Sequence, residues 1–234
     1  MSVITPSKID KSSNFVSGTL LLIDKPLEWT SFDVVKKIKG FVRPSKVGHA
    51  GTLDPFAEGV LVICIGRMTK KVESLMDHEK EYIATIQLGS ETDTLDTEGK
   101  VIKVAKITPL SARKIIDILN TFLGETSQVP PMYSALKVNG KRLYELAREG
   151  KVIERQSRKI TISEIELLER NKDSLKIRVK CGRGTYIRVL ASDIANTMNT
   201  VGFLKSLVRT QVGEFKQEDS MSVEDVVEWL SATA

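Results

Sequence analysis

Apolar positions along the chain fall into two kinds of pattern that predict strands. Continuous apolar runs at residues 18–24 and 60–65 predict buried strands, because neither face of such a strand is left polar. Strict alternation at residues 174–181 predicts a strand with one buried face. That face would carry Leu175, Ile177, Val179 and Cys181, and further strands are expected at 82–88 and 160–168.

Helical spacing of apolar residues predicts several helices between these strands. One begins after Thr30 and Ser31, either of which can cap its first turn. Its buried side would carry Phe32, Val35 and Ile38, and a second helix at 186–198 would bury Ile187, Leu190, Ala191, Ile194 and Met198. Other helices are expected from Thr108-Pro109, over 142–149 and over 223–230. Since strands and helices do not alternate regularly, the expected class is α+β with a largely antiparallel sheet.

The two ends of the chain differ in pattern. Residues 1–17 are polar, rich in Ser and Lys and unpatterned, which predicts a disordered tail before one domain at 18–234. The sequence shows no apolar run near the roughly 20 residues of a membrane span and no signal-peptide core. Cys64 and Cys181 lie in apolar surroundings outside any CxxC pattern. We therefore expect a cytoplasmic protein with reduced thiols.

Positive charge is concentrated in one stretch, residues 137–159, which we call the basic segment. It holds eight Lys or Arg against three Glu, a net +5 that equals the charge of the whole chain. Such a stretch suits a surface that follows phosphates, and it equally suits a solvated helix face. Charge alone leaves both interpretations open.

One acid stands in an unusual setting, the turn Gly48-His49-Ala50-Gly51-Thr52-Leu53-Asp54-Pro55. The two glycines permit backbone angles that other residues avoid, and Pro55 biases Asp54 toward an extended conformation. A turn of this kind can present a carboxylate with little freedom, as a nucleophile requires. Asp-Pro pairs are also common in ordinary surface turns, so the short motif needs support from elsewhere.

Motifs for metals and nucleotides are incomplete in this sequence. His78-Glu79 lacks the second histidine of a zinc-protease helix, and Leu95 occupies a ligand position of the calcium-loop pattern at 93–99. Neither of the common glycine-rich phosphate-binding motifs is present. We expect no metal and no cofactor.

The string at 48–55 resembles the catalytic motif of the tRNA pseudouridine synthase B family, whose aspartate would be Asp54. Four more segments resemble motifs of that family in the same order. They are 80–99, 129–150, 181–188 and 204–215, so the resemblance runs from about Gly18 to Phe215. It implies the pseudouridine synthase fold, a curved mixed sheet with flanking helices and a central active-site cleft.

The resemblance also implies roles for individual residues. Asp54 would be the nucleophile, Tyr82 would stack on the target base, and Arg188 would keep the acid ionised. Substrate binding would involve His49, Lys80, Asp96, Tyr186 and Leu207, and RNA contacts would come from Lys137, Lys141, Arg142 and Arg148 in a mobile clamp at about 125–152. Without the motifs, tyrosine and leucine at these positions would be read as core residues, and the others as loop or surface residues.

The implied activity is isomerisation of uridine to pseudouridine at position 55 of the tRNA T-loop by a monomer, with the base flipped out of its stack. Glu28 and Val208 depart from the family pattern, where glycine and arginine are usual. The chain stops near where many relatives append a small RNA-binding domain, so we expect a weaker grip on the acceptor arm. Two alternatives are a noncatalytic RNA-binding or tRNA-folding protein on the same scaffold and the same chemistry on another stem-loop.

Overall fold

The computed structural model describes residues 2–4, 15, 18–138 and 140–233. The chain forms two compact units, of which the first comprises residues 1–83 and 207–234 and the second residues 84–206. Strands β5 (Lys80–Leu88) and β13 (Gly202–Val212) pair with one another, and each runs from one unit into the other. Each unit is described separately below.

The sheet of the first unit is built around β4 (Ala57–Ile65). Strand β1 (Ser2–Ile4) is parallel to β2 (Thr19–Lys25), and β2 is antiparallel to β4. Strand β3 (Val47–Ala50) is antiparallel to β4, and β13 is parallel to it. The hairpin partner of β13 is the short strand β14 (Phe215–Lys216).

Register shows that β3 and β13 share one edge of β4. Ile65 pairs with β2 on one side and with β3 on the other. Gly59, at the opposite end of β4, pairs with β2 on one side and with Arg209 of β13 on the other. Strands β3 and β13 therefore lie end to end along the same edge of β4. The loop that joins β3 to β4 leaves the sheet at this edge.

Both faces of this sheet are buried, as the continuous apolar runs predict. Helices α1 (Ser31–Lys39) and α6 (Val223–Thr233) cover one face, with Leu21, Ile63 and Val226 among the buried contacts. Helix α2 (Val72–Met76) packs on the other face. The described residues of this unit also form two short 3₁₀ helices, η2 (Gly66–Lys71) and η3 (Gln217–Asp219).

The predicted disordered tail at 1–17 differs from the structure at residues 2–4, which form β1. The ring of Phe15 also packs edge-on against Trp229 of α6, with 6.1 Å between centroids. Edge pairing with β2 holds this three-residue segment as a strand, although it is too short to show a periodic pattern. The remaining residues of the predicted tail, 1, 5–14, 16 and 17, lie outside the described part of the chain.

The second unit continues with antiparallel pairing. Beyond β5 the order is β12 (Ser174–Cys181), β11 (Arg158–Arg170) and β8 (Gly124–Gln128). Both β11–β12 and β11–β8 are antiparallel. Helix α3 (Ala112–Asn120) contacts β11 and α5 (Ile187–Thr197).

Two short hairpins and one further helix of the second unit lie outside that sheet. Strands β6 (Ser90–Thr92) and β7 (Val101–Val104) form one hairpin, and β9 (Lys137–Val138) and β10 (Lys141–Arg142) form another. Helix α4 (Leu143–Arg148) follows β10 directly.

Most predicted core faces are confirmed, and one is wrong. All four residues of the predicted face of β12 and all five of the predicted face at 186–198 are buried. Phe32 is 67% exposed, however, while Val34 is fully buried. The N-cap at Thr30 sets the phase of α1, and with that phase Ser31, Val34, Val35 and Ile38 face the core.

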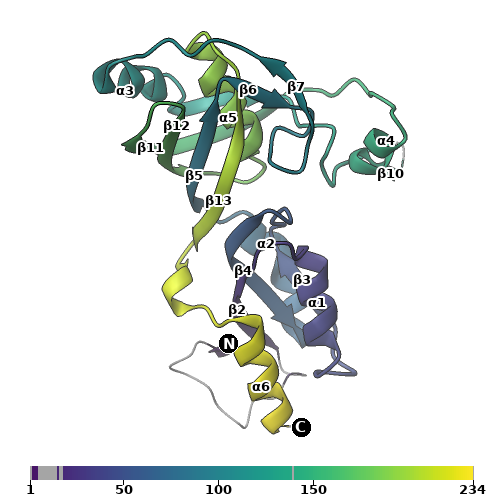
Figure 1. Ribbon diagram of the computed structural model, residues 1–234. Helices are drawn as coiled ribbons and strands as arrows, with labels where there is room; N and C mark the ends of the chain where they lie inside the picture. The colour runs from purple at the N-terminus through teal and green to yellow at the C-terminus, as the bar shows by residue number, and fades with distance from the viewer. Residues whose placement is uncertain (1, 5–14, 16–17, 139, 234) are drawn as a thin grey trace. The chain divides into compact units, whose positions relative to one another are not determined.

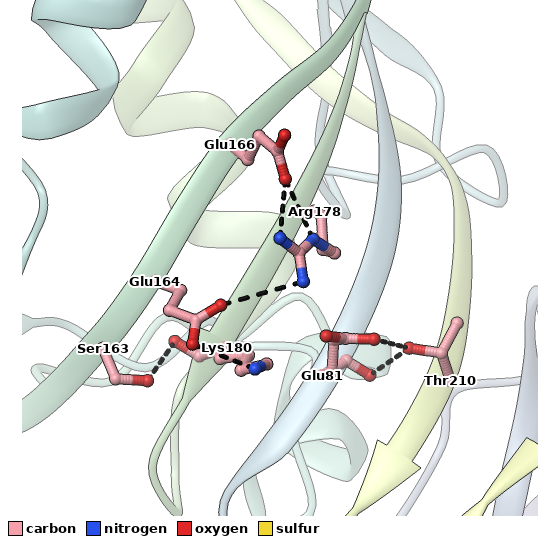
Figure 2. A network of polar contacts seen from close by, with 7 residues as sticks. All are labelled: Glu81, Ser163, Glu164, Glu166, Arg178, Lys180 and Thr210. Carbon is pink, nitrogen blue, oxygen red and sulfur yellow. Dashed lines mark hydrogen bonds and ion pairs between the residues drawn. The ribbon is translucent and has the colours of Figure 1, made fainter.

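Polar pairs cover the outer face of β11 and β12 (Figure 2). Arg178 Nη2 lies 2.7 Å from Glu166 Oε2, and Lys180 Nζ lies 2.9 Å from Glu164 Oε1. Pairs with this much exposure each contribute at most about 1 kcal/mol. They fix the register of the two strands more than they add stability.

Other sequence expectations concern the cysteines and membrane spans. Both Cys64 and Cys181 are buried and neither is in a disulfide, and burial raises the pKa of the Cys64 thiol to about 12. Within the described residues, no helix has the length and apolar character needed to span a membrane.

Candidate active site

Asp54 lies in loop 51–56, which joins β3 to β4 at the shared edge of β4. Its carbonyl accepts a hydrogen bond from the amide of Ala57 at 3.1 Å, where β4 begins. The preceding residue, Leu53, is buried with 3% of its surface exposed. The acid is therefore held between an anchored leucine and the first turn into the central strand.

Three carbonyls of this loop are each held by a buried side chain from another element. The hydrogen bonds join Arg209 Nη2 to Gly51 O at 3.1 Å, Ser31 Oγ to Leu53 O at 3.1 Å, and Lys25 Nζ to Pro55 O at 3.3 Å. The Ser31 hydroxyl also accepts from the Leu53 amide at 2.9 Å. Backbone groups on both sides of Asp54 are thus fixed by strands β2 and β13 and by helix α1.

The guanidinium of Arg209 replaces a strand partner at the edge of β4. Pairing with β13 ends at Gly59 and pairing with β3 covers only residues 62–65, and Arg209 Nε donates to the intervening Val60 carbonyl at 2.7 Å. Arg209 is only 1% exposed. Glycine is required beside it, because a Cβ on Gly59 would lie 2.2 Å from the Arg209 carbonyl oxygen.

Glu28 braces the same loop in a backbone conformation that glycine favours. Its amide donates to the Pro55 carbonyl at 2.9 Å, and its φ is +66°. The glycine usual at this position in the family would adopt this angle without strain. The substitution has therefore kept the glycine-type geometry of the turn.

Several predicted site residues of the first unit gather near the Asp54 loop. Leu207 pairs in register with Ala57, three residues after Asp54, and is 7% exposed. Lys80 is also 7% exposed, its Nζ donates to the Met76 carbonyl, and its Cε lies 4.0 Å from a Cβ placed on Gly51.

Tyr82 lies two residues after Lys80 in β5 and shares its buried alternating face, with 8% of its surface exposed. On the neighbouring strand, Thr210 Oγ1 donates to Glu81 Oε1 at 2.7 Å (Figure 2). That hydrogen bond ties β13 to the segment of β5 that carries Tyr82.

His49 lies in β3, paired with Ile63, and is half-buried. Burial lowers its pKa below the usual 6.5, and the positive charge of Arg209 lowers it further. The imidazole is therefore neutral near pH 7. A neutral ring is suited to packing against bases.

In the second unit, the predicted site residue Arg188 binds two other segments and is 4% exposed. Its Nη1 lies 3.2 Å from Asp96 Oδ2 and donates to the Thr94 carbonyl at 2.9 Å. Its Nη2 donates to the Tyr133 carbonyl at 2.7 Å. One guanidinium thus ties the loop at 93–99 to the segment at 129–150.

Asp96 is itself fully engaged within its loop. Thr94 Oγ1 donates to Asp96 Oδ1 at 2.5 Å, and the Glu98 amide donates to the same oxygen at 3.0 Å. A buried acid with these partners orders the loop and holds Arg188.

Tyr186 is fixed at the start of α5 by one amide side chain. Gln128 Oε1 accepts from the Tyr186 amide at 2.8 Å, and Gln128 Nε2 donates to the Tyr186 carbonyl at 3.1 Å. Gln128 ends strand β8 and is 5% exposed. The position of Arg188, two residues later, follows from this anchor.

The predicted RNA-contacting residues lie around β9, β10 and α4, and all four are exposed. Arg142 and Arg148 stack on the ring of Tyr144, with 5.7 and 5.5 Å from the guanidinium carbon to the ring centroid. Leu143 and Leu146 anchor the helix by burial. The cations Lys137 and Lys141 complete a basic surface on this hairpin and helix.

Four residues that support the site were not singled out from the sequence, namely Lys25, Ser31 as a loop anchor, Gln128 and Arg209. One of them, Arg209, occurs in the segment at 204–215 that resembles a family motif, and the other three lie outside all five such segments. Among the described residues, no cluster of three or more His, Cys, Asp or Glu could hold a metal ion.

Comparison with known proteins identifies the family. A model of the TruB family pseudouridylate synthase N-terminal domain matches residues 39–187. The tRNA pseudouridine synthase B of Phocaeicola vulgatus is 47% identical over 223 residues, covering 93% of this chain and 95% of that protein. The protein of the same name from Francisella tularensis subsp. tularensis is 52% identical over 208 residues, covering 88% of this chain and 69% of that protein.

Solved structures support the fold. The chain matches one in a Cbf5-Nop10-Gar1 complex with a TM-score of 0.73 and 29% identity, over 96% of this chain and 58% of that one. A chain from an H/ACA RNP bound to a substrate RNA containing 2′-deoxyuridine matches with a TM-score of 0.67 and 26% identity, over 92% and 54%. The chain thus spans little more than half the length of these solved chains.

The predicted α+β class with a largely antiparallel sheet is confirmed, as is the predicted family. The family assignment also favours the catalytic interpretation over a noncatalytic RNA-binding protein. The chain belongs to the TruB family of pseudouridylate synthases and is an isomerase.

Proposed function

We propose that the chain converts uridine to pseudouridine at position 55 in the T-loop of tRNA, with Asp54 as the nucleophile. Its relatives at 47% and 52% identity are named tRNA pseudouridine synthase B, and the match covers most of this chain. The observation that carries the catalytic assignment is the triple anchoring of loop 51–56 around Asp54. A nucleophile gains most when its backbone is fixed before the substrate arrives.

The reaction requires no net oxidation and no water. The bond between N1 of uracil and C1′ of ribose breaks, a bond between C5 and C1′ forms, the proton leaves C5, and N1 gains one. The Asp54 carboxylate supplies the covalent intermediate, either on the ribose carbon or on the uracil ring, and is released when the new bond is complete. Either point of attack requires the base to be flipped out first, at a cost of a few kcal/mol.

The surroundings of Asp54 suit a flipped pyrimidine. Leu207, in register with the residue that begins β4, provides an apolar wall, and Tyr82 stacks on the uracil and accepts its C5 proton. His49 occupies the space that the base leaves in the T-loop. Its lowered pKa keeps it neutral there, so stacking is not opposed by desolvation of a charge.

The role of Arg188 in keeping Asp54 ionised remains a prediction of this proposal, because the two residues belong to different units. An opposite charge in contact with a carboxylate favours its charged form. Asp96 and the Thr94 carbonyl, both in the loop at 93–99, fix the guanidinium, so it is oriented before RNA binds. Tyr186, anchored by Gln128, contributes to substrate binding from the first turn of α5.

The basic surface on β9, β10 and α4 contacts the RNA backbone. Lys137, Lys141, Arg142 and Arg148 are exposed and can neutralise phosphates, and Lys80 adds a cation close to loop 51–56. Closure of the segment at about 125–152 over the T-arm, a monomeric state and a cytoplasmic location remain predictions of this proposal.

Tritium release tests the substrate assignment. A T-arm transcript labelled at carbon 5 of its uridines should release tritium with the native chain, and replacing the uridine at position 55 by cytidine should abolish the release. Release that persists after this replacement would place the modification elsewhere. Mapping pseudouridines in cellular RNA with and without the protein then identifies any other stem-loop substrate.

A further inference from the structure

The hydroxyl of Ser31 makes contacts that set it apart from an ordinary helix-capping serine. It is 3% exposed, and it binds both backbone groups of Leu53, a residue 22 positions away. Capping of α1 is done by its neighbour instead, since Thr30 Oγ1 accepts from the Asp33 amide at 3.0 Å and Asp33 Oδ2 accepts from the Thr30 amide at 3.0 Å. The Ser31 hydroxyl is therefore free of any role in starting its own helix.

We infer that Ser31 is a positioning residue for catalysis, which acts by fixing the backbone directly before Asp54. This inference rests on the proposed role of Asp54 as the nucleophile. The Ser31 hydroxyl accepts from the Leu53 amide and donates to the Leu53 carbonyl, so it satisfies both backbone groups as a neighbouring strand would. These two hydrogen bonds fix the backbone of Leu53. Because Leu53 directly precedes Asp54, they also fix the position of the Asp54 Cα.

Helix α1 gives that hydrogen-bonded pair a rigid base. Val34, Val35 and Ile38 are buried against β2 and β4, and the capping box fixes the first turn. Hydrogen bonds from Thr30 lower the pKa of the capping acid Asp33, which favours its ionised form. Movement of Ser31 would thus require movement of the core of the first unit.

Ser31 is also the anchor that can be removed with least disturbance. Arg209 and Lys25 carry buried charges that bind two and three carbonyls, so their loss would leave several buried acceptors unsatisfied. Replacing Ser31 by alanine removes one oxygen and leaves the helix cap intact. Its effect on catalysis can therefore be separated from unfolding.

The inference predicts a defect in the chemical step alone. With Ser31→Ala, the single-turnover rate of tritium release from T-arm RNA should fall about tenfold or more, as expected for small misplacements of reacting groups. The Kd for the same RNA should stay within about twofold of the native value, because Ser31 is buried and cannot touch RNA. Ser31→Thr keeps the hydroxyl and should restore most of the rate.

A matched control is Thr121→Val, which removes another hydroxyl bonded to a backbone carbonyl. Thr121 Oγ1 donates to Ile118 at 2.7 Å at the end of α3, in the second unit. This variant should turn over at the native rate. If Ser31→Ala does not fold, Ser31→Cys replaces it, since a thiol of similar size is a weak donor and acceptor and should be slow for the same reason.

The outcomes separate cleanly. A native rate for folded Ser31→Ala or Ser31→Cys overturns the inference, and so does a Ser31→Thr variant as slow as alanine, or a rate loss matched by equal loss of RNA affinity. Asp54→Asn is measured in parallel. If that variant is active, the proposed nucleophile is wrong whatever Ser31 does, whereas an inactive Asp54→Asn beside a fast Ser31→Ala removes only the positioning role.

Discussion

His49 shows how a single neighbour alters the chemistry of a residue. Burial and the adjacent Arg209 lower its pKa below 6.5 in the folded chain. Between that lowered pKa and 6.5, the unfolded chain binds more protons than the folded chain, so the free energy of unfolding rises with pH across this window. Above 6.5 this histidine contributes no further change.

The predicted measurement is urea unfolding at several values from about pH 5 to about pH 7.5. His49→Gln, which cannot titrate, should show a smaller rise in the free energy of unfolding across the window than the native chain. An identical rise in both proteins would contradict the effect of burial on this residue.

Sequence alone made Asp54 the candidate nucleophile but predicted none of the anchors of its loop, because every anchor is a long-range contact. Ser31 binds a residue 22 positions away, Lys25 binds one 30 positions away, and Arg209 binds one 158 positions away. Local motifs carry no signal for such pairs. The burial of Arg209 was especially difficult to predict, since an arginine is usually expected at the surface.

At the level of elements, β13 was not predicted as a strand, and its composition explains why. Its outward residues and the buried Arg209 break the alternation that marks a half-buried strand. The strand is specified instead by close contact with β4, where Gly59 (φ +99°) admits the Arg209 backbone.

That contact predicts a large effect for a small substitution. Gly59→Ala should destabilise the fold by about 3 kcal/mol or more, because its Cβ would meet the backbone of β13 and its φ disfavours side chains. Gly182→Ala is the control, since its Cβ would lie 3.8 Å from the Thr161 carbonyl in ordinary contact. Urea midpoints measure both, and similar midpoints for the two variants would refute the argument.

In the turn before α1, a substitution is expected to increase the stability of the fold. Glu28 occupies a left-handed conformation that costs a side-chained residue about 1–2 kcal/mol. Allowing for the greater entropy of glycine in the unfolded chain, Glu28→Gly should stabilise the fold by about 0.5–1 kcal/mol. A lower urea midpoint for the variant would show that the glutamate side chain makes a compensating contact.

Across the whole molecule, the class and family were predictable because five motifs occur in order along the chain. The division into two units was not, since β5 and β13 each belong to both and no composition change marks the boundary. As a result, Asp54 and Tyr82 belong to one unit and Arg188 to the other.

Charge on the whole molecule predicts the salt dependence of RNA binding. Changing Lys137, Lys141, Arg142 and Arg148 together to glutamine should weaken T-arm binding and reduce the slope of log affinity against log salt concentration by about 3. Changing the exposed Lys103 and Lys106, outside the basic segment, should leave the slope near the native value. Equal slopes for all three proteins would exclude the basic segment from phosphate contact.

The most direct test of the account concerns the carboxylate in loop 51–56. Asp54→Asn keeps the size of the side chain and removes its charge, and Asp117→Asn makes the same change at a half-exposed position on α3. With folding and RNA affinity checked for each, a nucleophilic Asp54 requires native tritium release for Asp117→Asn and none above background for Asp54→Asn. Pseudouridine formation at the native rate by Asp54→Asn would contradict it.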